Sequence, residues 1–192
     1  MPVVHRYDPP ERFIAGTVGE PGQRTFFLQA RAGTRLTSVA LEKQQVLVLA
    51  ERVDALLDDL MRTEEGETVV PAVTPTGMDD SDPLDQPIEE DFRAGTMTLA
   101  WDADTSRVVI EVFRFEDSDD LDPGAGGEEA EDDEVPTAEE LLVVSLTPGA
   151  ARAFSKRAQA VVAAGRPPCQ FCGNPLDPAG HLCPRANGFR RR

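Results

Sequence analysis

The sequence has few histidines, cysteines and tryptophans, and it lacks the motifs of several large enzyme classes. It has two histidines, three cysteines and one tryptophan in 192 residues. It contains no glycine-rich dinucleotide or P-loop motif, no GxSxG nucleophile elbow and no HExxH zinc motif. The H-x-E element of the nucleobase deaminases is also missing ahead of "PPCQFC". The sequence therefore indicates no particular reaction.

Long apolar runs are absent too. Residues 1–13, "MPVVHRYDPPERF", contain no apolar stretch behind a basic start, which a signal peptide would need. No run of about 18 apolar residues, the length that spans a membrane, occurs in the chain. We therefore expect a cytoplasmic protein without a membrane-spanning segment.

Basic residues are scarce, with 19 Lys and Arg against 35 Asp and Glu, so the net charge is -16. Eighteen of the acidic residues lie in two runs that contain no base, residues 79–91 and 116–134. Because such runs bury too little apolar surface to fold, we expect acidic disordered loops at about 64–88 and 116–138. From residue 150 onward the balance reverses, with eight basic residues and one acidic residue. The C-terminal part is therefore basic.

In the first half of the chain, a region rich in β-forming residues is followed by a region in which apolar residues recur with helical spacing. Residues 12–19, 24–31 and 34–43 are rich in β-formers and are separated by short turns, which predicts three antiparallel strands. In residues 44–62 the apolar positions recur at i, i+3, i+4 and i+7 instead. This spacing predicts an amphipathic helix packed on the strands through Val46, Leu49, Ala50, Val53, Leu57 and Leu60.

The second half repeats this order of elements. Residues 91–102 and 107–115 indicate a hairpin, and the short apolar run at 141–146 indicates a buried strand. Thr147, followed directly by a proline, is a suitable N-cap for a helix over 148–165.

These elements together predict an α+β fold with a mostly antiparallel sheet in βββα-βββα order and two packed helices. This domain would occupy residues 1–165. Residues 166–192 would form a small basic tail that binds zinc and resembles a zinc ribbon. Trp101 alternates with apolar neighbours and is expected in the core, whereas His5 is expected to be a surface residue in a frayed N-terminal segment.

The tail contains "CQFCGNPLDPAGHLCPR", which holds all three cysteines and one of the two histidines. Cys169 and Cys172 have the spacing of a zinc knuckle, and the glycine that follows them permits a tight turn. His181 and Cys183 are two positions apart, so both would face the same side of an extended segment. Three thiolates and one imidazole complete a tetrahedral shell with no position left for substrate. We therefore predict a structural Zn²⁺ site formed by Cys169, Cys172, His181 and Cys183.

Two other uses of these cysteines remain open. Cys169 and Cys172 could form a redox pair, although such motifs open a helix after a strand and this segment is rich in proline and glycine. Iron–sulfur ligation is the second alternative. An odd number of cysteines in one short tract fits poorly with a disulfide scaffold.

Two groups of arginines are candidates for binding anions. The first group lies on the predicted first sheet and would bind a phosphorylated metabolite, or would simply form a solvated strand face: Arg12, Arg24, Arg31 and Arg35. The second group ends the chain and could contact the phosphates of a nucleic acid, although the net charge of the protein opposes this: Arg190, Arg191 and Arg192.

Several long stretches of the sequence carry a family resemblance. They are "DPPERFIAGTVGEPGQRTFFLQAR", "VALEKQQVLVLAERVDALLDDL", "SLTPGAARAFSKRA" and "CQFCGNPLDPAGHLCP". Together they resemble an uncharacterised actinobacterial protein family, a domain of unknown function. The resemblance covers most of the chain except the acidic runs, and it implies no activity, substrate or catalytic residue.

Three functions are compatible with these features. The favoured one is a non-enzymatic binding or adaptor protein whose zinc site presents the basic tail to a protein partner. The alternatives are an enzyme of unrecognised type that acts on a phosphorylated metabolite, and a nucleic-acid-binding module. No catalytic residue is identified for the enzyme.

Overall fold

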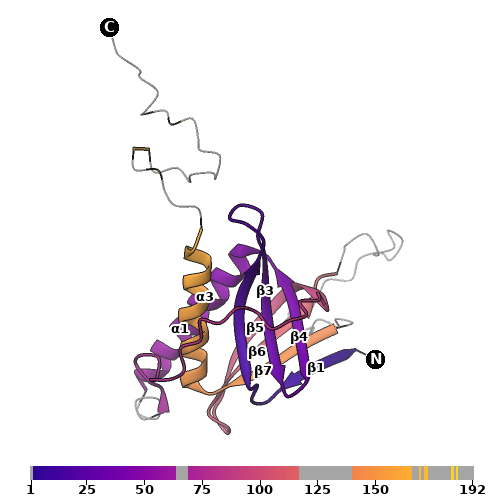
Figure 1. The fold of residues 1–192 in the computed structure, drawn as a ribbon. Helices are drawn as coiled ribbons and strands as arrows, with labels where there is room; N and C mark the ends of the chain where they lie inside the picture. Colours follow the sequence, from indigo (N-terminus) through magenta and orange to yellow (C-terminus); the bar gives the residue numbers. More distant parts are fainter. Residues whose placement is uncertain are drawn as a thin grey trace, which may run out of the picture.

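The computed structural model of the chain describes residues 2–63, 69–116 and 140–165, and in the tail Cys169, Phe171, Cys172, Cys183 and Arg185. These residues form an α+β fold in which a seven-stranded sheet packs against two helices (Figure 1). Within this part of the chain, neither helix is both long and apolar enough to cross a membrane.

The sheet is largely antiparallel, with the strand order β1-β7-β6-β5-β4-β3-β2. Its two parallel pairs are β1 with β7 and β4 with β5, and the latter is short, joining Val39 and Ala40 to Phe92 and Arg93. The strands are β1 (Val3–Tyr7), β2 (Arg12–Val18), β3 (Thr25–Ala32), β4 (Arg35–Leu41), β5 (Phe92–Asp102), β6 (Arg107–Arg114) and β7 (Glu140–Leu146).

Helices α1 (Lys43–Met61) and α3 (Pro148–Ala163) lie side by side and pack against each other (Figure 1). At the N-terminus of each helix, a side-chain oxygen accepts a hydrogen bond from a backbone amide. The Gln45 side chain accepts a hydrogen bond from the amide of Glu42 at 2.8 Å, and the Thr147 hydroxyl accepts one from the amide of Ala150 at 3.2 Å. The predicted N-cap at Thr147 is therefore confirmed.

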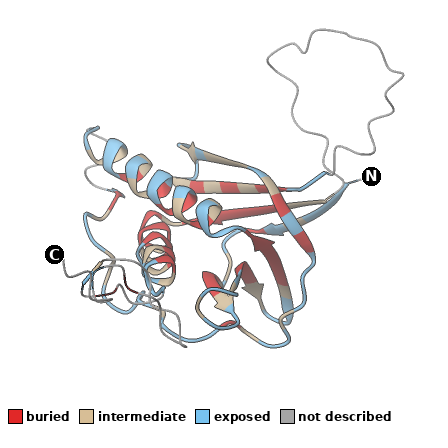
Figure 2. Cartoon of the chain, turned by 90° about the horizontal axis from the view of Figure 1, so that it is seen from above, coloured by how far each residue is buried: buried red, intermediate tan, exposed pale blue. Residues whose placement is uncertain are grey.

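Alternating side chains of the sheet supply two apolar clusters. In the larger one, residues such as Phe13, Leu28 and Val39 pack with the apolar faces of both helices, and Figure 2 shows the buried residues concentrated where helices and strands meet. In β2, β3 and β4 the neighbouring residues enter a smaller cluster, because successive side chains of a strand point to opposite faces. This smaller cluster consists of Ile14, Phe27, Ala40 and Leu84, with Ile88 packed against it.

Strand β5 contains a register shift between Ala94 and Met97. Gly95 lies in this irregular stretch, and a Cβ atom added to it would come within 2.9 Å of the Cα of Phe115. The backbone of a neighbouring strand end therefore occupies the space that a side chain would need.

Replacing Gly95 with alanine is expected to lower the free energy of unfolding by roughly 1 to 3 kcal/mol, because the clash involves backbone and cannot be relieved by a rotamer change. Chemical denaturation measures the change. Gly165→Ala is the matched control, since the nearest atoms to its added Cβ lie 4.0 Å away. Equal stability of the two variants would show that β5 moves freely away from Phe115.

The structure contains a strand that the sequence pattern does not predict, β1. The segment expected to fray forms β1, so the element order is ββββα-βββα rather than βββα-βββα. Tyr7 is 1% exposed, and its hydroxyl lies 2.8 Å from that of Thr37. His5 is half-buried and contacts Glu140 at 3.0 Å. Because β1 pairs with β7, far along the chain, no local pattern reveals it. Trp101, which was expected in the core, is only half-buried and packs against the larger cluster from outside it.

The prediction of a disordered loop over 64–88 is wrong for residues 69–88, which the structure describes. They contain no long helix or strand, but Val70 and Leu84 are buried, and the acidic side chains have basic partners on β2 and α3. The acidic run therefore packs because neighbouring elements supply its counter-charges. The second predicted loop, 116–138, lies outside the described residues except for Glu116.

Candidate metal centre

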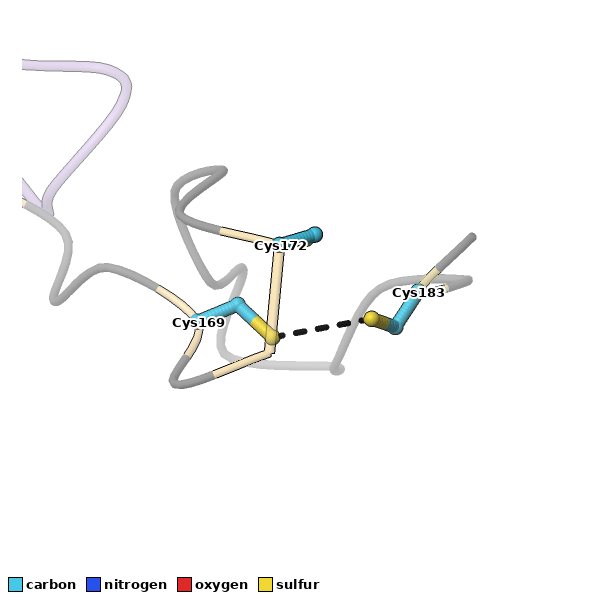
Figure 3. A group of neighbouring side chains, drawn as sticks. All are labelled: Cys169, Cys172 and Cys183. Atoms are coloured by element: carbon cyan, nitrogen blue, oxygen red, sulfur yellow. Dashed lines mark hydrogen bonds between the residues drawn. The ribbon is translucent and has the colours of Figure 1, made fainter. Parts of the chain in front are cut away.

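The three cysteines of the tail come together in space. Their sulfur atoms all lie within 4.8 Å of one another, and the Sγ atoms of Cys169 and Cys183 are 3.8 Å apart (Figure 3). Cys169 and Cys183 are buried, and Cys172 is half-buried. None of the three forms a disulfide. Among the described residues, this is the group of Cys, His, Asp and Glu side chains whose geometry suits a metal ion.

The turn between the first two cysteines favours the thiolate form of Cys169. The pKa of Cys169 is held below its usual value by backbone amides, chiefly that of Cys172 and then that of Phe171. The amide of Phe171 lies 3.4 Å from the sulfur. Amides that point at a sulfur stabilise its negative charge, and the thiolate is the form that binds metals.

A hydrogen bond joins the two segments that carry the cysteines. The guanidinium of Arg185 donates to the backbone carbonyl of Phe171 at 3.2 Å. Arg185 follows Cys183 closely in the chain, and Phe171 lies between the other two cysteines. This contact therefore holds the Cys183 segment against the Cys169–Cys172 turn.

The structure brings together three of the four predicted ligands. The fourth, His181, lies outside the described residues. Three sulfur ligands at this spacing suit a soft or borderline metal such as Zn²⁺ and do not suit Mg²⁺ or Ca²⁺, which take oxygen ligands. The three described cysteines thus form a possible metal site. Only their sulfur ligands indicate which metal it would hold.

The arginines predicted as anion-binding candidates do not converge on one site. Residues 69–88 lie between α1 and β5, and we call them the connecting segment. Arg12 and Arg31 pair with carboxylates of this segment, including Asp85. Arg24 donates to the carbonyl that ends α3, and Arg35 donates to a carbonyl of β1 and lies over the ring of Tyr7, 4.2 Å from its centroid. Each of the four therefore has an intramolecular role. The tail residues Arg190, Arg191 and Arg192 lie outside the described residues.

A half-buried charge cluster was not anticipated from the sequence. It consists of Arg12 on β2, Asp80 in the connecting segment and Arg157 on α3, and we call it the Asp80 cluster. The Asp80 carboxylate accepts hydrogen bonds from Arg12 at 2.6 and 2.9 Å and from Arg157 at 2.8 Å. The two arginine side chains are only 12% and 11% exposed. No local signal marks these residues, because Asp80 lies within an acidic run and its partners are far away in sequence.

The pKa values in the Asp80 cluster follow from these contacts. The hydrogen bond from Arg12 lowers the pKa of Asp80, and the same contact raises the pKa of Arg12. Burial is the main cause that lowers the pKa of Arg157. The cluster therefore keeps Asp80 ionised.

The Asp80 cluster lies beside a cavity of about 520 Å³ between β2, α3 and residues 77–82. Arg157 also donates to the carbonyls of Ala15 and Asp82, at 2.9 and 2.6 Å. With most of their N–H groups engaged in this way, the two arginines attach the connecting segment to the domain. These contacts are enough to hold residues 77–85 in place, so no bound ligand is needed to explain their conformation.

The structure thus combines an α+β fold with a group of three neighbouring cysteines near the C-terminus. The chain belongs to the family described as "Protein of unknown function (DUF3090)", which matches residues 5–183. The matched region extends from β1 to Cys183 and so contains all four predicted metal ligands. No curated protein and no solved structure matches the chain significantly.

Proposed function

We propose that the chain is a non-enzymatic binding or adaptor protein in which a structural Zn²⁺ site organises the tail and presents it to a protein partner. The observation that carries the proposal is the approach of three cysteine sulfurs to within 4.8 Å of one another. Cys169, Cys172 and Cys183 would supply three thiolates, and His181 the fourth ligand. A shell filled by protein ligands leaves no position for substrate, which favours scaffolding over catalysis.

The charge of the tail supports a partner of opposite charge. Residues 166–192 contain five arginines and one acidic residue, whereas the rest of the chain holds the other 34 acidic residues. A polyanion as extended as a nucleic acid would be repelled by the acidic domain, but a compact acidic surface on a protein could approach the tail alone. We propose a cytoplasmic location, because thiols remain reduced there.

The zinc site is tested with Cys172→Ser. The variant is expected to lose its zinc, falling from about one equivalent per chain to near zero, because a structural site needs its full set of ligands. Elemental analysis of protein purified without chelator measures the metal. Phe171→Ser is the matched control. It also introduces a serine into this turn, but it replaces an exposed side chain that is not a predicted ligand.

Two results would contradict the site. Wild-type protein that holds less than about half an equivalent after zinc is supplied has no such site. Full zinc content in Cys172→Ser would show that Cys172 is not a ligand. His181→Ala, analysed in parallel, tests the ligand that lies outside the described residues.

The partner class is tested by changing Arg190, Arg191 and Arg192 together to serine. Retention of a partner on the immobilised wild-type protein should disappear with this triple variant and should fall with rising salt. Nuclease treatment separates the two classes of partner. Retention that survives nuclease supports a protein partner, and retention that nuclease abolishes replaces it with the nucleic-acid alternative.

A further inference from the structure

Cys169 and Cys183 lie close enough together for a small movement to allow a disulfide bond. Their side chains come from two separate segments and point toward one another (Figure 3). The sulfur atoms are 3.8 Å apart, and a disulfide bond requires about 2.05 Å. A movement of less than about 2 Å therefore brings them to bonding distance.

We propose that Cys169 and Cys183 are a site of reversible oxidation by peroxide, at which a disulfide and the bound metal exclude one another. The proposal rests on the proposed zinc site, because it gives that site a means of releasing its metal. It assigns the reactive pair to Cys169 and Cys183 rather than to Cys169 and Cys172, the pair suggested by the C-x-x-C spacing.

Two observations favour this pair. The amide of Phe171 donates to the Cys169 sulfur at 3.4 Å, and this sulfur lies 3.8 Å from that of Cys183. A bond to Cys183 would join two segments that the hydrogen bond from Arg185 to the Phe171 carbonyl already holds together.

The chemistry balances with hydrogen peroxide as the oxidant. One of the two thiolates attacks an oxygen of the peroxide, the O–O bond breaks, and a sulfenic acid and hydroxide form. The second sulfur then attacks the sulfenic sulfur and displaces its hydroxyl group as water. In total, two thiolates lose two electrons, and one peroxide takes up these electrons and two protons to give two waters. A dithiol reductant reverses the change and is itself oxidised to a disulfide.

Disulfide formation removes two of the four proposed zinc ligands. One thiolate and one imidazole cannot hold a structural zinc ion, so the metal is released. The bond nevertheless closes a loop from Cys169 to Cys183 and keeps these two segments together. The tail therefore changes from a form held by metal to a form held by a covalent bond.

The experiment treats zinc-loaded wild-type protein with a small excess of hydrogen peroxide. Zinc release is followed with a colorimetric chelator, and the products are alkylated and mapped by mass spectrometry without reduction. We expect nearly all the zinc to be released, a Cys169–Cys183 disulfide within one chain, and an alkylated Cys172. Dithiothreitol followed by zinc should restore the metal content.

Two variants keep the result decisive even if the metal content of the tail differs from expectation. Cys172→Ser should still form the Cys169–Cys183 disulfide, whereas Cys183→Ser should form no disulfide within the chain. A main product that joins Cys169 to Cys172, or retention of zinc after peroxide, would overturn the inference. If the wild-type protein binds no zinc before oxidation, the proposed function fails, and disulfide mapping of the metal-free protein still decides the pairing.

Discussion

Replacing Asp80 with asparagine is expected to lower the free energy of unfolding by roughly 2 to 4 kcal/mol, because two guanidinium groups with little exposure to solvent lose their shared counter-charge. The Asp80 carboxylate is 30% exposed and contacts Arg12 and Arg157, whose side chains are 12% and 11% exposed. The amide of asparagine carries no charge and cannot accept all of these hydrogen bonds. Urea denaturation at neutral pH measures the difference.

Asp79→Asn is the matched control. It makes the same chemical change one position earlier, in an ion pair with Lys156 whose two side chains are both 62% exposed. Exposed ion pairs contribute about 0 to 1 kcal/mol, so this variant should stay close to the wild type. If both variants behave alike, the Asp80 cluster does not hold the connecting segment in solution.

The Asp80 cluster also predicts a dependence of stability on pH. Arg12 lowers the pKa of Asp80 in the folded protein, whereas an unfolded aspartate titrates at about 3.9. The contribution of this carboxylate to stability is therefore present above about pH 5 and is lost as the pH falls through the lower, folded pKa. Between neutral and acidic pH, the wild type should lose more stability than Asp80→Asn. Denaturation midpoints across this range measure the difference, and identical slopes would show that Arg12 does not lower the pKa of Asp80.

Leu57→Ala is expected to lower the free energy of unfolding by roughly 2 to 5 kcal/mol, because it leaves a cavity in the larger apolar cluster. Leu57 lies on α1 and is 0% exposed. Leu56→Ala is the control on the same helix, because Leu56 is only partly buried and its removal should cost clearly less. Thermal and chemical unfolding provide the measurement.

The same variant tests whether the proposed zinc site is independent of the α+β fold. Leu57→Ala should keep about one equivalent of zinc at temperatures below its unfolding transition, since no ligand is changed. Cys172→Ser should show the opposite behaviour, with no zinc and a nearly unchanged transition for the α+β domain. A large loss of domain stability in Cys172→Ser would show that the metal site supports the whole fold.

Most of the secondary structure could be predicted because its signals are local. The change from alternating to helical spacing marks α1, and the Thr147 hydroxyl marks the start of α3. These patterns reflect which side of each element faces the core, and a few successive residues are enough to show them.

The features that could not be predicted depend on partners distant in sequence. Val3–Tyr7 forms a strand because β7 lies beside it, and Asp80 is ordered because Arg12 and Arg157 neutralise it. The general rule that a dense acidic run remains disordered fails at residues 79–85 for this reason. The predicted metal ligands lie between these two cases. The C-x-x-C spacing is a local signal, but the approach of Cys183 to Cys169 spans 14 positions.

The parallel pairing of β1 with β7 has a consequence for synthesis of the chain on the ribosome. His5 and Glu140, which contact each other across this pair, are 135 positions apart. Strand β1 therefore leaves the ribosome long before it can pair with β7, because the residues between His5 and Glu140 must be synthesised first. Until then β1 has no β7 beside it, and Tyr7 lacks part of its final surroundings. Completion of the sheet thus depends on contacts of long sequence separation, which form slowly.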